Sequence, residues 1–452
     1  MRPLFVPLFS LAVLFAFASN SYSQPIEISV DVATPTNTPE GAVGAALLEL
    51  CPKLDASETL DQNAQQLQDI CHLILNADPA TIGAALKAIS AKAGTSETTV
   101  VTRTPATQQL AGISKRLAAL RHGASGFSVS DLMLNIDGKP VSADQLAKAF
   151  TNTLRGGGAG DDTGIAASRL GGFVSGDFTF STQDETANES GFDGNSQRLT
   201  AGMDYRFRES GFAGVAASFL KGAVDLNGKA GSLDAKDYGL TLYGTYYPSQ
   251  SWYAEGTLNV GHQTFDLSRD INFTLSGTTI SQTADSNTSG NAYGFSLGTG
   301  YEHAWQNGIT GSLNSSLIYS KAKIDAYEEN HAGGLNLAVN SQSIDSLIFS
   351  LGGQLSRAIS TKRGVLLPQL SASWMHEFKQ DGQLIRAHFT ADPSKTPFSF
   401  TTPKRDTNYF TLAAGASFVF PGGRTVYIQY QTLRLLENYS QYMISLGGRM
   451  EF

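Results

Sequence analysis

From residue 170 to the end of the chain, apolar and polar side chains alternate with a period of two. Twelve segments show this alternation, and each has about ten or more residues, which is enough to cross a bilayer as a tilted strand. Alternation of this kind is typical of strands whose two faces meet different surroundings. The twelve predicted strands are Leu170–Phe180, Gln197–Arg208, Phe212–Asp225, Lys236–Tyr247, Trp252–Leu267, Asn291–Trp305, Ile309–Ile324, Asp345–Ser360, Val365–Lys379, Asn408–Phe420, Arg424–Leu435 and Tyr439–Phe452.

The last predicted strand separates its two faces clearly. A soluble sandwich would place the apolar face against a second sheet, whereas an outer-membrane barrel would place it against lipid and the polar face in the lumen. This strand alone does not choose between the two. Its apolar face holds Tyr442, Ile444, Leu446, Met450 and Phe452, and its other face holds Met443, Ser445, Arg449 and Glu451.

The connections between the predicted strands alternate between short and long. Gln306–Gly308 and Pro421–Gly423 are short, whereas Ser268–Gly290 and Gln380–Thr407 are long and polar. Short periplasmic turns opposite longer outer loops, with an even number of strands, are expected of an outer-membrane barrel. The sequence therefore predicts a mainly β fold, a twelve-stranded antiparallel transmembrane β-barrel preceded by a small α-helical domain.

The chain before the barrel has a helical pattern. Apolar stripes, and prolines directly after Asp78 and Thr104, predict the helix starts. Cys51 and Cys71 are the two cysteines, and in an exported protein such a pair favours a disulfide over a metal site. The predicted helices are Gly41–Leu50, Ser57–Leu75, Pro79–Ala93 and Pro105–Arg121.

The first residues resemble a secretory signal peptide. Residues 1–23 contain one positive charge, an apolar run and small residues before Gln24, which predicts cleavage near Ser23 and export by the Sec translocon. The predicted organisation is a signal peptide (1–23), a helical domain (24–103), a linker (104–164) and a barrel (165–452). Within the linker we expect a hairpin turning at Asp137–Gly138 and a helix over Ser142–Leu154.

Composition and motifs narrow the function. Charged residues are only 16% of the chain and glycine is abundant at 46 residues, which suits a large membrane sheet. The net charge of −8 argues against a nucleic-acid partner, and we predict no metal and no cofactor. The motif Gly-x-Ser-x-Gly over Gly294–Gly298 lies inside a predicted strand, whereas a nucleophile elbow needs a strand, a turn and a helix. Ser296 is therefore predicted to face the lumen, and the chain is predicted not to be an enzyme.

Three segments carry a resemblance to the autotransporters of type V secretion: Tyr238–Tyr247, Val365–Phe378 and Ile444–Phe452. The resemblance implies a barrel that holds a helix in its lumen and an amino-terminal passenger that reaches the cell surface. It also implies that the barrel-assembly machinery reads the last strand as its signal. The residues of that signal would be Phe452, Met450, Leu446, Ile444 and Tyr442.

A helix over residues 113–121 resembles the threading helix of this family. Its Lys115, Arg116 and Arg121 would suit a polar lumen that contains Glu255 and Glu451. The predicted helix over Ser142–Leu154 is a rival for the lumen.

The predicted function is that of an outer-membrane translocator that displays residues 24–103 at the surface of a Gram-negative cell. Its predicted partners are outer-membrane lipid, the barrel-assembly machinery and the Sec translocon. The alternative is a porin-like channel with a periplasmic helical domain. The passenger is expected to stay attached, and the sequence does not specify its surface ligand.

Overall fold

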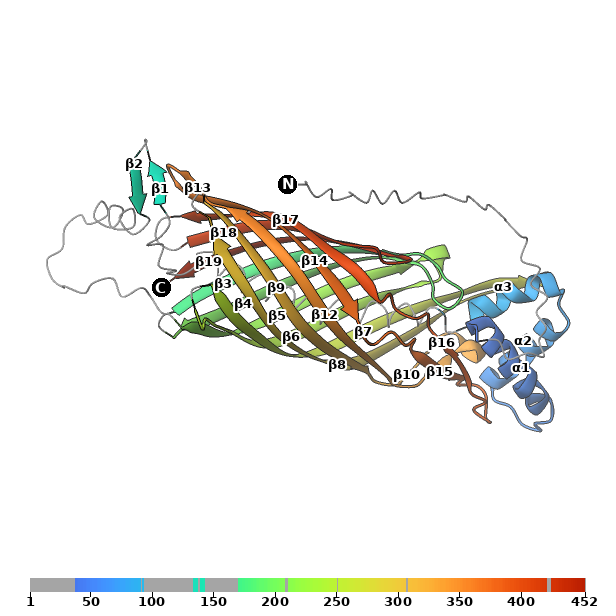
Figure 1. The fold of residues 1–452 in the computed structure, drawn as a ribbon. Helices are drawn as coiled ribbons and strands as arrows, with labels where there is room; N and C mark the ends of the chain where they lie inside the picture. The colour runs from blue at the N-terminus through green and yellow to red at the C-terminus, as the bar shows by residue number, and fades with distance from the viewer. Residues whose placement is uncertain are drawn as a thin grey trace, which may run out of the picture.

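A computed structural model shows a long antiparallel barrel with a small helical unit at one end (Figure 1). The structure describes residues 37–90, 92, 133–136, 139–142, 170–207, 210–249, 251–305, 308–420 and 424–451. The predicted signal peptide, the candidate lumen helix with Lys115, Arg116 and Arg121, residues 143–154 of its rival and Phe452 lie outside these residues, whereas Ser142 is the end of a short strand and not the start of a helix.

Twelve strands close the barrel, as the sequence predicts. Each strand pairs antiparallel with its neighbours in chain order, and pairing of β19 with β3 and of β12 with β14 completes the ring. The barrel strands are β3 (Leu170–Gln183), β4 (Phe192–Arg206), β5 (Gly211–Leu226), β6 (Gly231–Tyr246), β7 (Trp252–Leu275), β8 (Thr278–Ala304), β9 (Ile309–Ile324), β12 (Gln342–Arg357), β14 (Gly364–Glu377), β17 (Asn408–Phe420), β18 (Arg424–Arg434) and β19 (Tyr439–Glu451).

Through the middle of the barrel the apolar side chains point outward and the polar ones inward. Leu242 of β6 is 54% exposed, whereas Thr241 beside it is fully buried and accepts a hydrogen bond from the Asn259 side chain (3.0 Å). On β19, Leu446 is exposed and Ser445 is buried. This arrangement confirms the predicted face assignment, and an outward apolar surface over polar inward positions is typical of a barrel in lipid.

At one end of the barrel the two faces exchange character along the same strands. On β7, Leu258 and Val260 point outward, but beyond Gln263 the apolar side chains Phe265 and Ile271 point inward and are buried. Leu233 of β6 also points inward there. The outward positions of β7 in this region are polar: Thr264, Asp266, Ser268, Asp270, Asn272 and Thr274. Here water, and not lipid, surrounds the sheet, and the interior is an ordinary apolar core.

The predicted long polar loop over Ser268–Gly290 is wrong. These residues continue β7 and β8 as a two-stranded extension, which turns at Ser276 (φ 49°) and Gly277 (φ 84°). Two consecutive positive φ angles fit the two-residue turn preferred in hairpins. β7 has 24 residues and therefore extends about 80 Å, far more than the roughly 30 Å of hydrocarbon in a bilayer.

The predicted loop over Gln380–Thr407 also contains two strands. Together with two short strands after β9, they form a separate four-stranded sheet, ordered β10, β11, β15 and β16. The bounds are β10 (Tyr327–Glu328), η3 (Gly333–Leu335), β11 (Leu337–Val339), β15 (Leu384–Phe389) and β16 (Phe398–Thr401). The remaining short elements are β1 (Met133–Ile136), β2 (Lys139–Ser142), η2 (Asn227–Lys229) and β13 (Ile359–Thr361); β1 and β2 form the predicted hairpin.

The helical unit consists of α1 (Pro39–Asp55), α2 (Gln62–Leu75) and α3 (Pro79–Ile89). Its first two helices start at capping side chains, since Thr38 accepts from the Gly41 amide (3.2 Å) and Asp61 from the Ala64 amide (2.8 Å). α3 starts at Pro79, as predicted. The unit lies at the end where the β7–β8 extension projects, and the carboxyl terminus lies at the other end (Figure 1). We call the helical unit together with the four-stranded sheet and η3 the cap.

Candidate functional site

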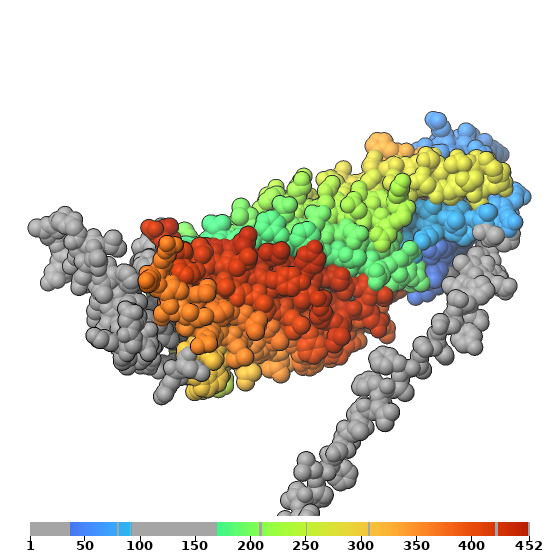
Figure 2. All heavy atoms as spheres, turned by 90° about the horizontal axis from the view of Figure 1, so that it is seen from above, coloured from blue at the N-terminus to red at the C-terminus, as the bar shows by residue number. Residues whose placement is uncertain are grey.

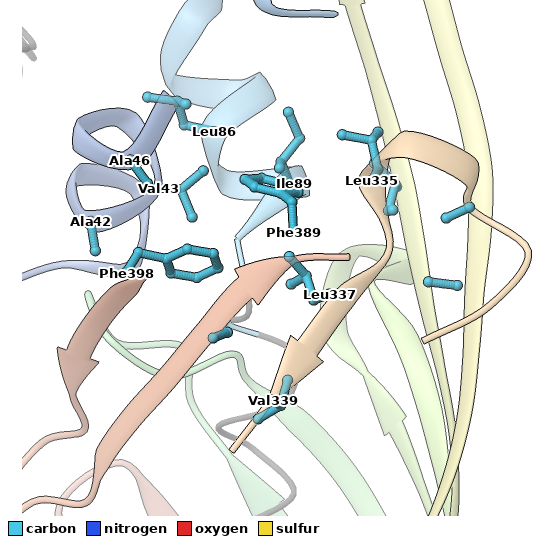
Figure 3. Close-up of a cluster of buried hydrophobic side chains, with 14 of the residues drawn as sticks. Ala42, Val43, Ala46, Leu86, Ile89, Leu335, Leu337, Val339, Phe389 and Phe398 are labelled. Atoms are coloured by element: carbon cyan, nitrogen blue, oxygen red, sulfur yellow. The ribbon is translucent and has the colours of Figure 1, made fainter. Parts of the chain in front are cut away.

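The cap and the barrel share one hydrophobic core. Buried side chains of all three helices, of the small sheet and of the inward faces of β4 to β9 belong to the same cluster. Figure 3 shows its centre, where Phe389 and Phe398 of the small sheet meet Val43 of α1 and Ile89 of α3. In Figure 2 the helices (blue) lie directly against the atoms of the β7–β8 extension (yellow). The helical unit is therefore fixed to the end of the barrel by burial of apolar surface.

A buried ion pair reinforces this attachment. Arg269 of β7 donates to Glu329 through Nε (2.8 Å) and Nη2 (2.5 Å), and both side chains are almost fully buried. The same guanidinium also donates to the backbone oxygens of Ala88 (3.3 Å), Ile89 (3.1 Å) and Leu335 (3.0 Å). It thus connects the barrel to the last turn of α3 and to η3. A cation at the carboxyl end of a helix also interacts favourably with the helix dipole.

Two glycines allow α2 to approach η3 closely. The Gly334 amide donates to Oε1 of Gln66 (2.9 Å), and a Cβ at Gly334 would lie only 2.6 Å from the backbone nitrogen of Leu67. Gly333 has a φ of 53° and a Cβ there would collide with Gln66. Larger residues would therefore push the helix away from the small sheet.

A second ionic contact joins α3 to the connection between β3 and β4. Glu185 pairs with Lys92 (2.8 Å) and Lys87 (2.5 Å), and Lys92 is buried and lies 3.8 Å from Glu40 of α1. Partial burial alone would raise the pKa of the Glu185 carboxyl, but the two lysines outweigh it and lower that pKa below its ordinary value.

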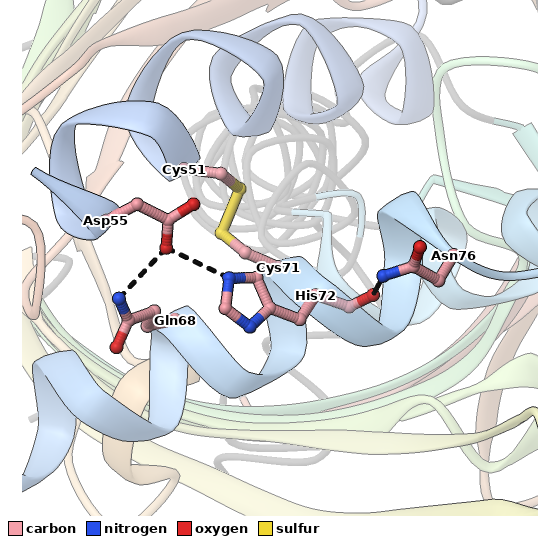
Figure 4. The surroundings of a disulfide bond; sticks show 6 residues. All are labelled: Cys51, Asp55, Gln68, Cys71, His72 and Asn76. Atoms are coloured by element: carbon pink, nitrogen blue, oxygen red, sulfur yellow. Dashed lines mark hydrogen bonds and ion pairs between the residues drawn. A yellow bond between two sulfur atoms is a disulfide. The ribbon is translucent and has the colours of Figure 1, made fainter.

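The predicted disulfide is present and joins α1 to α2. The Sγ atoms of Cys51 and Cys71 are bonded, and their Cα atoms are 5.7 Å apart (Figure 4). One turn away, Asp55 accepts one hydrogen bond from Nε2 of Gln68 (2.9 Å) and pairs with Nε2 of His72 (2.9 Å), and both contacts lower the pKa of Asp55. Within the described residues, no cluster of His, Cys, Asp and Glu has the arrangement of a metal site.

Inside the barrel, polar side chains pair with one another. Arg449 of the last strand lies 3.3 Å from Asp204, and Ser445 donates to Asp177 (2.5 Å). Ser296, the centre of the Gly-x-Ser-x-Gly motif, lies within β8 and hydrogen bonds to Oγ1 of Thr257 (2.8 Å). The strand setting of Ser296 agrees with its predicted lumen-facing position.

The last strand presents its apolar side chains outward. Tyr442, Leu446 and Met450 are exposed, Ile444 is half-buried, and the rings of Tyr442 and Phe180 stack with centroids 4.9 Å apart. No helix among the described residues is long and apolar enough to span a membrane. The exposed apolar side chains of the strands lie on the outside of the barrel, and the buried apolar cluster lies at its cap end.

Comparison with known proteins agrees with this geometry. The family model for the autotransporter beta-domain matches residues 172–431, more than half of the chain. The chain belongs to the autotransporter family. As an autotransporter barrel it is an outer-membrane protein of Gram-negative bacteria, and the family match favours a translocator over the porin-like alternative.

Solved structures of autotransporter barrels are also similar. The translocator domain of NalP from Neisseria meningitidis has a TM-score of 0.48 at 15% identity, covering 69% of this chain and 95% of that one. The β domain of the Bordetella autotransporter BrkA has a TM-score of 0.45 at 18% identity, covering 63% and 100%.

Two curated relatives are 30% identical over 212 residues: the esterase EstA of Pseudomonas aeruginosa and that of Pseudomonas putida. The match covers 46% of this chain and 31% of each relative, so the chain spans about a third of their length.

These relatives contradict the prediction that the chain is not an enzyme. Both are named as esterases. The prediction rested on the Gly-x-Ser-x-Gly motif, which lies within β8 and is structural. A structural role for Gly294–Gly298 excludes only that motif as a source of the catalytic serine. Hydrolytic triads are recognised by the geometry of their residues and not by one sequence pattern, so other residues could form one.

Proposed function

We propose that this autotransporter displays its helical unit at the cell surface as part of a cap fixed to the outer mouth of the barrel. The observation that carries the proposal is the position of the unit. β4 ends at Arg206 and β17 ends at Phe420, and the next strand of each starts only four or five positions later, at Gly211 and Arg424. These strand ends lie at the carboxyl-terminal end of the barrel, and the helices pack at the opposite end (Figure 1). Short turns face the periplasm in outer-membrane barrels, so the helices would face outward.

The path of the chain supports export of the amino-terminal region. α3 ends at Ile89 against the β7–β8 extension, whereas β3 starts at the other end of the barrel, where Gly171 pairs with Glu451. Residues 90–169 therefore connect opposite ends of the barrel. We retain the division into a helical passenger (24–103), a linker (104–164) and a barrel (165–452) as part of this proposal.

The contacts distinguish a fixed cap from a passenger on a tether. The helices share their core with the small sheet and the barrel, and Arg269 holds the end of α3 from within the barrel strands. A unit anchored in this way stays at the mouth, which agrees with the expectation that it is not cleaved.

The orientation can be tested by thiol labelling of intact cells. Glu58 is exposed in the connection between α1 and α2, and Lys362 is exposed at the carboxyl-terminal end of the barrel. Because the native cysteines are bonded to each other, a Glu58→Cys or Lys362→Cys variant carries one free thiol. A membrane-impermeant maleimide should label Glu58→Cys on intact cells and Lys362→Cys only after permeabilisation. The reverse pattern would place the helices in the periplasm and refute the proposal.

Assembly partners follow from the same proposal. We propose that the Sec translocon exports the chain and that the barrel-assembly machinery reads the last strand through Phe452, Met450, Leu446, Ile444 and Tyr442. Tyr442, Leu446 and Met450 are exposed on the outer face of the strand, which supports this role, because a side chain on that face is accessible to a partner protein. Removal of Phe452 should reduce the heat-modifiable, folded form on a gel, and normal mobility would refute the role of that residue.

Ester hydrolysis is a second candidate function, favoured by the names of the two curated relatives. The chain spans only about a third of the length of these relatives, so their activity cannot be assumed for it. The test therefore measures hydrolysis by this chain. The purified full chain should hydrolyse a p-nitrophenyl ester of a short fatty acid above the rate of the heat-denatured protein. A rate equal to that control would eliminate this candidate and leave surface display intact.

A further inference from the structure

Along the barrel strands, the apolar side chains change from the outer face to the inner face near the cap. The place of this change locates the edge of the lipid-facing part of the barrel on the cap side. On β5 the last outward aromatic is Phe219, on β6 it is Tyr238, and their rings lie 5.1 Å apart. Just beyond them the inward side chains become apolar, with Val224 and Leu233 buried. Aromatic girdles mark the two interfaces of a membrane barrel. The next outward position on each strand therefore lies at the level of lipid head groups.

Two lysines occupy these positions. Lys221 on β5 and Lys236 on β6 are direct partners in the antiparallel register, and both are exposed. Directly opposed residues have Cβ atoms about 5 Å apart, and like charges in this position destabilise the pair of strands. Within the part of the chain that the structure describes, neither ammonium group forms an ion pair.

Other lysines on the same rim have a counter-charge. Lys379 donates to Asp345 (2.8 Å) and Lys321 lies 3.8 Å from the same carboxylate. Near the Lys221–Lys236 pair, the outward carboxylate of Asp234 follows two residues further from the membrane edge. Outward from the membrane, the order at this place is aromatic, then basic, then acidic.

We propose that Lys221 and Lys236 bind the phosphate group of a phosphorylated glycolipid in the leaflet on the cap side, with its acyl chains beside Phe219 and Tyr238. Two opposed ammonium groups supply charge-assisted donors to one phosphate, which removes their mutual repulsion. The aromatic pair below supplies apolar surface for a chain that leaves the head group toward the hydrocarbon. The inference rests on the outward orientation of the cap proposed above.

The test is lipid binding by the purified full chain in neutral detergent. The probes are bis-phosphorylated lipid A, the same lipid without phosphate, and inorganic phosphate. The variant is K221Q/K236Q, and the matched control is K362Q/R363Q, which removes two positive charges at the opposite end of the barrel. The wild type should prefer the phosphorylated lipid, and K221Q/K236Q should bind it roughly thirtyfold more weakly, given the usual gain per basic residue at an anionic surface.

Several results would overturn the inference. Equal affinity of K221Q/K236Q and the wild type for phosphorylated lipid A would do so, as would an equal loss in K362Q/R363Q. Displacement of the lipid by inorganic phosphate alone would assign the site to free phosphate. Binding in detergent does not depend on orientation, so its failure would leave the thiol-labelling result untouched, and the two proposals fail separately.

Discussion

The membrane-facing middle of the barrel, which we call the band, and the end of the barrel beside the cap are built from the same strands but have opposite apolar faces. In the band, Leu242 and Val260 point outward and Thr241 points inward, because lipid surrounds the sheet and polar groups line the lumen. In the cap region, Phe265 and Ile271 point inward on the same strand that carries Val260 outward. The period of two never breaks, so the solvent outside each segment decides which face is apolar. A single strand can therefore record where the membrane ends.

The largest expected effect is on the buried ion pair of the cap. Arg269→Ala should destabilise the attachment of α3 by about 3–5 kcal/mol, because it leaves the Glu329 carboxylate buried without its partner. Hydrogen exchange of the α3 amides would measure it. The matched double variant Arg269→Met with Glu329→Gln should recover most of the loss. If both variants lose the same stability, the packing of the two side chains, and not the unpaired carboxylate, determines how firmly α3 is attached.

A charge introduced on the outer face of the membrane-facing part of the barrel tests whether lipid surrounds it. Leu242→Arg should lower the free energy of unfolding in lipid vesicles by about 2–4 kcal/mol, since the guanidinium would face hydrocarbon near the midplane. Leu242→Ala is the control for lost apolar area and should cost less. If arginine and alanine cost the same, the outer face at this level would not be in lipid.

Removal of the disulfide should affect the cap and the strand ends that share its core, but not the membrane-facing part of the barrel. The 20-residue separation of Cys51 and Cys71 predicts a loss of about 3 kcal/mol for Cys51→Ser with Cys71→Ser, through a less constrained unfolded state. Protease digestion should then cut α1 and α2 faster while the barrel stays heat-modifiable. Faster digestion of the strands around Thr241 and Leu242 as well would contradict this expectation, because these residues lie outside the shared core.

The smallest effect is that of pH on the contact between α3 and the β3–β4 connection. The pKa of Glu185 is lowered in the folded protein, so its contribution is complete above the ordinary glutamate pKa of 4.5 and is lost as the pH falls through the folded value. Exchange of α3 amides should therefore quicken, after correction for intrinsic rates, at pH values below 4.5. A Glu185→Gln variant should show a weaker response, and an unchanged response would assign the effect to other carboxylates.

Local patterns in the sequence were enough to predict the barrel, the helices of the cap and their disulfide, but not the small sheet or the packing of the cap on the barrel. The twelve strands, their outward faces and the disulfide follow from periodicity and cysteine count. The β7–β8 extension was missed because its outward row, from Thr264 to Thr274, has the composition of a loop, while its inward row changes from polar to apolar only at Phe265. The two or three residues of β10 and β11 are too few to show a period.

The shared core depends on contacts between distant segments. Arg269 contacts Glu329, Ile89 and Leu335, which lie 60, 180 and 66 residues away from it in the chain, and no local spacing signals such contacts. The inward apolar positions of β5, β6 and β7 beyond the membrane edge were the available signal. Because these inward side chains are apolar, other apolar side chains must cover them at the mouth of the barrel, and the helices provide these side chains.

The most direct test of the account is hydrogen exchange of the wild-type protein in detergent, resolved for α3 and for the outer part of β7. If the cap and barrel share one core, the amides of α3 should be protected together with those around Ile271 and should open at the same denaturant concentration. Rapid exchange in α3 while β7 stays protected would contradict the account, because the helices would then be a tethered passenger and not a fixed cap.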